Sequence, residues 1–197
     1  MDFFKLFYNR YYIENILRAW PPMIVTFMIL LTLITTKVEY LLFLLVVIFS
    51  ENFNSFIKEN VFKPLMKGKD IPILGTGTRP EGAINCAPFL STKGDIKSKS
   101  YGMPSGHSQT AVLFAVYFIL DILYGNLGEY KTNNEKMIGV SGLSIITFAV
   151  LFSRLKFGCH TLQQIIVGTI IGALIAGVYF FNKDDLIAYL QRSISSY

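Results

Sequence analysis

The stretch "AWPPMIVTFMILLTLITT", residues 19–36, carries no charged side chain and is apolar almost throughout. A helix needs about 20 mostly apolar residues to cross the hydrocarbon core of a bilayer. The stretch therefore predicts a membrane-spanning helix. A basic and aromatic leader precedes it, and no small-residue cleavage site follows. We therefore expect a retained anchor and not a removed signal peptide.

The same pattern returns along the rest of the chain. Of its 197 residues, 52% are hydrophobic, and they gather in four further runs at 38–56, 105–124, 137–152 and 162–181. Runs of this length predict helices, and no soluble domain is apparent between them. The sequence thus predicts an all-α fold, a polytopic transmembrane bundle of about five spans.

The segments outside the spans complete the predicted organisation. Residues 1–18 mix aromatic side chains with Lys5, Arg10 and Arg18, which favours an amphipathic helix in the membrane interface. An ordered cap on the bundle is the alternative. Residues 19–182 are predicted to form one membrane-embedded domain, and residues 183–197 a C-terminal tail. The net charge of +5 favours anionic lipid head groups as partners over nucleic acid.

The two histidines of the chain, His107 and His160, each lie at a predicted helix mouth. Five spans place both on the same face of the membrane. An excess of Lys and Arg on that face favours the cytoplasm by the positive-inside rule. Cys86 and Cys159 lie on the same face and lack metal-ligand spacing, so two free thiols or one disulfide between them both remain open.

The first histidine stands in "PSGH", residues 104–107. Pro104 and Ser105 are typical of a helix start, and Gly106 leaves the backbone open to close approach. Backbone N–H groups at a helix N-terminus form a site for anions. His107 is then expected beside whatever anion is held there.

The second histidine stands in "SRLKFGCH", residues 153–160. Arg154 precedes His160 by six residues, and Gln164 follows it by four, one helical turn away. Two more cations near membrane mouths, Lys58 and Arg79, could complete a cage for a phosphoryl group. With two histidines for nucleophilic and acid–base work, such a cage needs no metal and no cofactor.

These motifs resemble the type 2 phosphatidic acid phosphatase (PAP2) superfamily over roughly residues 50–182. The stretches "GMPSGHSQ", "HTLQQIIVG" and "NFNSFIKENV" are particularly similar to its dolichyl-diphosphatase branch. The resemblance implies a PAP2-like bundle and metal-independent hydrolysis of a lipid phosphate, with polyprenyl (dolichyl) diphosphate as the leading substrate. A phosphatidic acid or other phospholipid monoester phosphatase, and a membrane protein that only binds lipid phosphates, are the alternatives.

The resemblance also implies roles for individual residues. His160 would be the nucleophile that forms a phosphohistidine, and His107 would protonate the leaving group and then activate water. Gln164 would orient His160. The phosphate oxygens would be held by Lys58, Arg79, Ser105, Gly106 and Arg154. By the same analogy we expect an endoplasmic reticulum or related membrane, with the site on the lumenal face.

The chain departs from the family pattern twice. The lysine and the Arg-Pro pair of the first motif are separated here, so Lys63 and Lys69 remain alternatives to Lys58. Gln164 replaces an Asp, which keeps an acceptor for His160 without its negative charge.

Two expectations concern packing. Gly168 and Gly172 in the last span favour close helix approach, within the bundle or in a homodimer. Asp121, near a helix end on the opposite face, is expected to be solvated.

Overall fold

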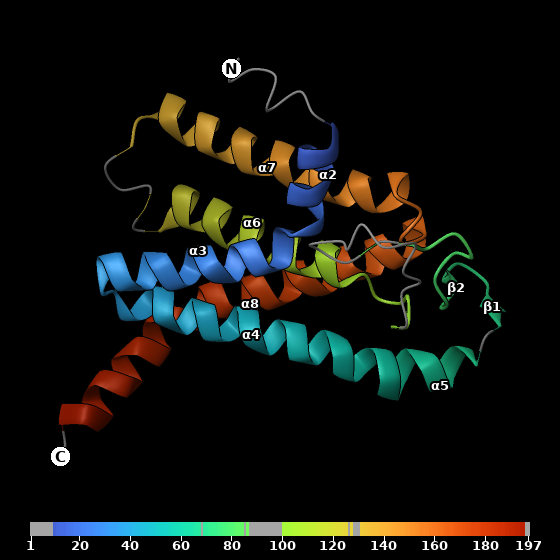
Figure 1. Cartoon of the computed structure of the whole chain (residues 1–197). Helices are drawn as coiled ribbons and strands as arrows, with labels where there is room; N and C mark the ends of the chain where they lie inside the picture. The colour runs from blue at the N-terminus through green and yellow to red at the C-terminus, as the bar shows by residue number, and fades with distance from the viewer. Residues whose placement is uncertain are drawn as a thin grey trace.

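The computed structural model describes residues 10–67, 69–84, 86, 100–125, 127 and 131–195. The described part is largely helical (Figure 1), with the major helices α2 (Arg10–Arg18), α3 (Trp20–Thr35), α4 (Val38–Ile57), α6 (Gly106–Tyr124), α7 (Asn133–Lys156) and α8 (Leu162–Ser195). A π-helical turn, Lys58–Phe62, extends α4 into the short α5, Lys63–Met66. Beyond it, β1 (Asp70–Ile71) pairs antiparallel with β2 (Gly75–Thr76).

Four of these helices are long and apolar enough to cross a membrane: Val38–Met66, Gly106–Tyr124, Asn133–Lys156 and Leu162–Ser193. The pair α2 and α3 passes the same test together, with a bend of 71° between Tyr12–Arg18 and Trp20–Thr35. The predicted all-α bundle of about five spans is confirmed. The chain is an integral membrane protein.

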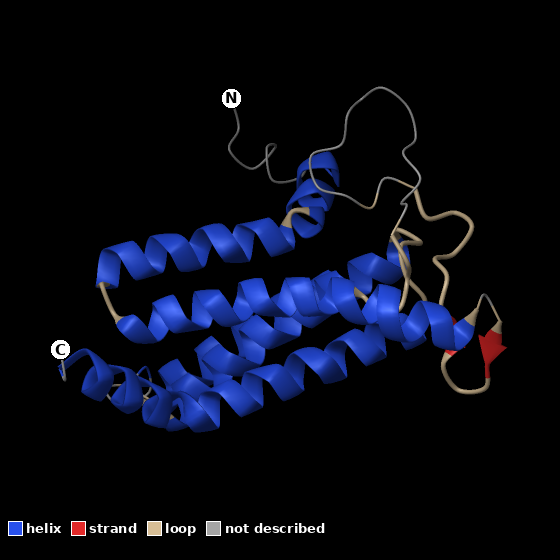
Figure 2. Ribbon diagram, turned by 90° about the horizontal axis from the view of Figure 1, so that it is seen from below, coloured by secondary structure: helices blue, strands red, loops and turns tan. Residues whose placement is uncertain are grey.

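The bend between α2 and α3 has a cause in the sequence. Pro21 and Pro22 occupy the first turn of α3, where a missing N–H costs nothing because those donors have no partner within the helix. In the interior of a helix, by contrast, a proline ring collides with the carbonyl four residues earlier and breaks the helix. The chain therefore turns after Arg18, and α2 lies at an angle to α3 (Figure 2).

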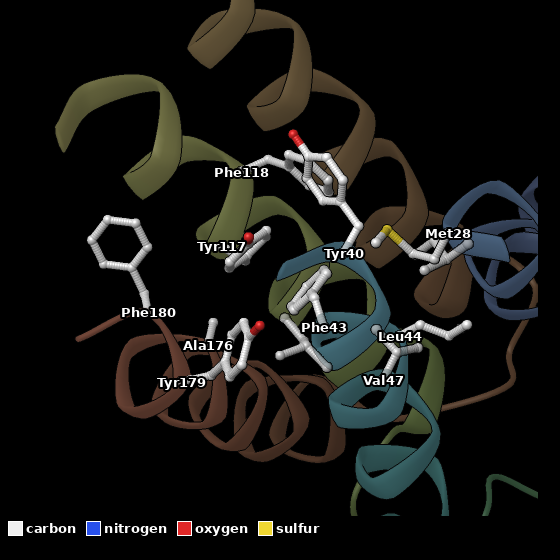
Figure 3. Close-up of a cluster of buried hydrophobic side chains, with 12 residues drawn as sticks. Met28, Tyr40, Phe43, Leu44, Val47, Tyr117, Phe118, Ala176, Tyr179 and Phe180 are labelled. Atoms are coloured by element: carbon white, nitrogen blue, oxygen red, sulfur yellow. The ribbon is translucent and has the colours of Figure 1, made fainter. Parts of the chain in front are cut away.

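The core of the bundle is an aromatic cluster between α4, α6 and α8. Phe43 stacks on Tyr117 with ring centroids 3.8 Å apart, and Tyr179 lies 5.6 Å from Phe43. Met28 of α3 is fully buried in the same cluster (Figure 3). These contacts fix how α4, α6 and α8 stand relative to one another.

The small residues of α8 serve packing inside the bundle. A Cβ atom on Gly168 would lie 2.4 Å from the carbonyl oxygen of Ser105, and one on Gly172 would lie 2.3 Å from that of Gln109. Helix α6 thus occupies this face of α8. The expected packing within the bundle is confirmed, and the homodimer through Gly168 and Gly172 stays a prediction.

The end of the bundle near the C-terminus of α6 holds a buried charge cluster. Lys183 of α8 donates to Asp121 at 3.0 Å and also pairs with Glu39 of α4. Asp121 is only 1% exposed, so the expectation that it is solvated was wrong. The reason is the length of α8, which passes residue 182 without a break and carries Lys183 into the bundle.

Candidate active site

A cavity of about 480 Å³ lies at the N-terminal end of α6. It brings together groups from five separate parts of the sequence, and its described lining is Pro21, Pro22, Glu51, Asn54, Ser55, Lys58, Glu59, Arg79, Ser100, Gly106, His107 and His160. Both histidines, Lys58, Arg79 and Gly106 therefore meet around one space, as the motifs predicted.

His160 is held by hydrogen bonds at both ring nitrogens. Its Nδ1 lies 3.0 Å from Gln164 Oε1, and its Nε2 lies 3.1 Å from Nη1 of Arg79. A guanidinium can only donate, so Nε2 must accept and the proton sits on Nδ1. Burial, and then the charge of Arg79, hold the pKa of His160 well below its ordinary value. The result is a neutral imidazole with its lone pair at Nε2.

Arg79 follows β2 in a loop, and further hydrogen bonds that it donates fix it beside His160. Its Nε and Nη2 donate to the carbonyl and the hydroxyl of Ser100, at 3.0 and 2.7 Å. Its Nη1 also donates to the carbonyl of Cys159 at 3.1 Å. A planar guanidinium so placed suits a phosphate held in front of Nε2.

Gln164 joins the histidine to that loop. Its Oε1 accepts from His160, while its Nε2 donates to the carbonyls of Thr76 at 3.0 Å and Thr78 at 2.7 Å. Gly102 lies against it so closely that a Cβ there would be 2.7 Å from Nε2. An aspartate could not donate to these carbonyls. The amide thus orients His160 and also ties down the segment that leads to Arg79.

Helix α4 contributes one face to the cavity. Glu51, Asn54, Ser55 and Lys58 follow one another at helical spacing and all line it. The Lys58 amine lies 3.9 Å from the Cβ position of Gly106, and the π-helical turn begins at Lys58 itself. Such turns often occur at functional sites.

The structure also separates the three candidate lysines. Lys63 is exposed and pairs with Glu59 on its own helix at 2.6 Å, and Lys69 is exposed near the hairpin. Among these three, only Lys58 lines the cavity.

Arg154 and Ser105 lie behind the cavity wall and are absent from its described lining. Arg154 is fully buried, donates to the carbonyl of Cys86 at 3.4 Å, and has its Nη2 without a hydrogen-bond partner in the described part of the chain. Ser105 caps α6 by accepting from the N–H of Ser108 at 3.4 Å. Cys86 and Cys159 form a disulfide, the second of the two states left open above.

Some site groups were not expected from the sequence. Glu51 and Asn54 could have been found from their helical spacing to Lys58. Asn54 also donates to Gln109 of α6 at 2.7 Å, which joins the two helices below the cavity. His107 Nε2 lies 2.8 Å from the main-chain carbonyl of Arg18. No sequence motif predicts the contact between His107 and the carbonyl of Arg18.

Comparison with known proteins agrees with the motifs. The model of the PAP2 superfamily matches residues 23–186. A dolichyldiphosphatase of Saccharomyces cerevisiae is 39% identical over 93 residues, 46% of this chain and 37% of the relative. Dolichyldiphosphatase 1 of Homo sapiens is 34% identical over 104 residues, 49% of this chain and 42% of the relative.

A longer match extends over most of the chain. Dolichyldiphosphatase 1 of Rhinolophus ferrumequinum is 26% identical over 184 residues, 90% of this chain and 66% of the relative. The chain therefore spans less than two thirds of the length of these relatives. No solved structure gives a significant match. Since the family match covers most of the chain, including both histidine motifs and the cavity residues between Glu51 and His160, the chain belongs to the PAP2 superfamily.

Proposed function

We propose that this protein is a metal-independent lipid phosphatase that hydrolyses a polyprenyl diphosphate to the monophosphate and inorganic phosphate. The observation that carries the proposal is the neutral His160, with its Nε2 lone pair in a cavity beside Arg79 and a second histidine. The relatives named dolichyldiphosphatase support this choice of substrate.

In the first step, Nε2 of His160 attacks the terminal phosphorus. Arg79 exchanges its hydrogen bond with Nε2 for the phosphate oxygens, which frees the lone pair. The bond from phosphorus to the bridging oxygen breaks, and His107 gives its proton to the departing oxygen. Lys58, Arg79 and the N–H groups at the start of α6 stabilise the negative charge on the equatorial oxygens.

In the second step, water attacks the phosphohistidine. His107, now neutral, takes a proton from the water as its oxygen bonds to phosphorus. The bond from phosphorus to Nε2 breaks, inorganic phosphate leaves, and both histidines return to their starting states. Gln164 keeps the proton of His160 on Nδ1 throughout, so Nε2 remains the reacting atom.

A diphosphate suits a histidine without a charged partner. A phosphate leaves more readily than an alkoxide, so the reaction makes a smaller demand on the nucleophile. Gln164 accepts from His160 as an Asp would, but it adds no negative charge. Phosphatidic acid is the second candidate, since it would bind the same cations. A catalytically weak protein that only binds lipid phosphates is the third.

We propose an endoplasmic reticulum or related membrane, with the cavity on the lumenal face. The disulfide between Cys86 and Cys159 supports this orientation, because disulfides persist in oxidising compartments and are rare in the cytosol. The bridge lies directly beside His160 in the chain, on the cavity side of the bundle.

The test is phosphate release by purified protein in detergent with EDTA present. We expect polyprenyl diphosphate to be hydrolysed faster than phosphatidic acid, and a His160→Ala variant to release none. Acid-labile phosphate on wild-type protein after a rapid quench would report the phosphohistidine. Faster hydrolysis of phosphatidic acid would overturn the substrate, and release that is equal in His160→Ala would overturn the mechanism.

A further inference from the structure

The contact between His107 and Arg18 fixes which nitrogen of His107 can exchange protons. The carbonyl of Arg18 only accepts, and Nε2 of His107 lies 2.8 Å from it. Nε2 therefore carries a proton and donates it. The remaining nitrogen, Nδ1, is the one left to exchange protons in the cavity that His107 lines.

The sequence explains why this carbonyl is open to a side chain. In a continuous α-helix the carbonyl of Arg18 would accept from the N–H of residue 22, and in a 3₁₀ turn from that of residue 21. Both residues are proline and have no N–H. The same prolines bend the chain by 71° after Arg18. The end of α2 is thus left with an acceptor that α3 cannot satisfy.

The side chain of Arg18 holds this end of α2 in place. Its guanidinium lies 4.6 Å from the ring centre of Phe157, in the turn after α7. Arg154 stacks on the same ring at 5.4 Å. Cation–π contacts of this kind are attractive. Phe157 therefore joins α2 to the segment that carries Arg154 and, six residues after Arg154, His160.

The contact matters because an imidazolium at this site has unfavourable neighbours. The positive charges of Arg154, Arg79 and Lys58 all repel a protonated His107. A general acid must nevertheless carry its extra proton when the substrate arrives. A carbonyl at the C-terminal end of a helix is the negative end of the helix dipole and favours a cation. Its hydrogen bond also becomes stronger when the donor is charged.

We propose that the main-chain carbonyl of Arg18, left open by Pro21 and Pro22, positions His107 and stabilises its protonated form for leaving-group protonation. The leader helix α2 then contributes to the positioning of a catalytic residue. The proposal rests on the function proposed above, in which His107 is the acid.

The test restores the missing donor. Pro22→Ala supplies the N–H that would bind the carbonyl of Arg18 in a continuous helix, and Pro21→Ala/Pro22→Ala also relieves the bend. Each variant is assayed for the first step alone, as leaving-group release in a single turnover, on phosphatidic acid, whose alkoxide must be protonated, and on p-nitrophenyl phosphate, whose phenolate leaves without a proton. General acids typically contribute about 10²–10⁴-fold. We expect the phosphatidic acid rate of the double variant to fall at least about 10-fold further than its aryl rate.

Two reference variants make the outcome decisive. His107→Ala should show the same selective loss, and Pro72→Ala, at an exposed proline of the hairpin, should show none. If His107→Ala loses both rates equally, the acid role in the proposed function fails. If His107→Ala is selective but the proline double variant is inactive on both substrates alike, or active on both, the inference about Arg18 is overturned.

A spectroscopic measurement tests the contact without turnover. With only two histidines, ¹⁵N-labelled imidazole signals can be assigned by comparison with His160→Ala. We expect His107 to show a protonated Nε2 in wild type, and this signature to weaken in Pro21→Ala/Pro22→Ala. A signal that is unchanged by the double variant would contradict the proposal.

Discussion

Replacing Gln164 by Glu separates two roles of this side chain. A carboxylate would increase the basicity of His160, and by charge alone the variant should be faster. The structure predicts the opposite, because Nε2 of Gln164 donates to the carbonyls of Thr76 and Thr78 at 3.0 and 2.7 Å. Glu cannot donate to both in either protonation state, and an ionised Glu would repel both oxygens.

The size of the effect follows from the bonds lost. Each hydrogen bond contributes a net stabilisation centred on about 1 kcal/mol, so losing one or both costs about 1–2 kcal/mol. If this energy is withdrawn from the placement of Arg79, kcat/KM falls by about 5- to 30-fold. Arg79 would hold phosphate before and during the reaction, so most of the loss should appear as a higher KM.

The assay is steady-state phosphate release from polyprenyl diphosphate in detergent, with Gln163→Glu as the matched control. Gln163 is the exposed neighbour in the same helical turn and lies beside Gly75, so its variant adds the same charge but leaves the bonds from Gln164 to Thr76 and Thr78 in place. We expect Gln163→Glu to behave like wild type. Activity of Gln164→Glu equal to or above wild type would refute the reasoning, and so would an equal loss in both variants.

Three further predictions use other parts of the molecule. Because burial and the charge of Arg79 lower the pKa of His160, its neutral form should persist below about pH 6.5. In Arg79→Gln the acidic limb of the pH profile of kcat/KM should therefore move to higher pH. An acidic limb at the same pH as in wild type would contradict this. Lys183→Met leaves two buried carboxylates without their cation and should lower the free energy of unfolding by about 3–5 kcal/mol, measured by melting in detergent. Gly168→Ala, whose Cβ would meet a carbonyl at 2.4 Å, should cost about 1–3 kcal/mol, whereas Gly177→Ala has open space and should melt like wild type.

The spans could be predicted because each depends on its own composition. The unpredicted features depend on which helix meets which. In a hydropathy analysis Asp121 is a single charge near the end of one helix. The ion pair with Lys183 depends on how α8 packs against α6, which the sequence does not give. Gly168 likewise indicated close packing without identifying α6 as the partner.

In the candidate site, too, some residues could be predicted from the sequence and others could not. His107, His160 and Arg79 were found because motifs name side chains. The choice of Lys58 over Lys63 required the path of α4 through its π-helical turn. The contact from His107 to Arg18 could not be predicted, because a main-chain carbonyl leaves no mark in the sequence beyond the two prolines that free it.

The buried cluster of Lys183 has a consequence for how the protein is made. Glu39 and Asp121 lie on the first and second of the three helices that meet there, and Lys183 lies on the last. A chain still being synthesised must hold both acids in the membrane without their cation, since Lys183 emerges after them. Both acids lie near helix ends, where insertion costs less than the about 2.5–3.5 kcal/mol of a charge at the helix centre. A chain that stops before the last helix would therefore leave both acids without their cation.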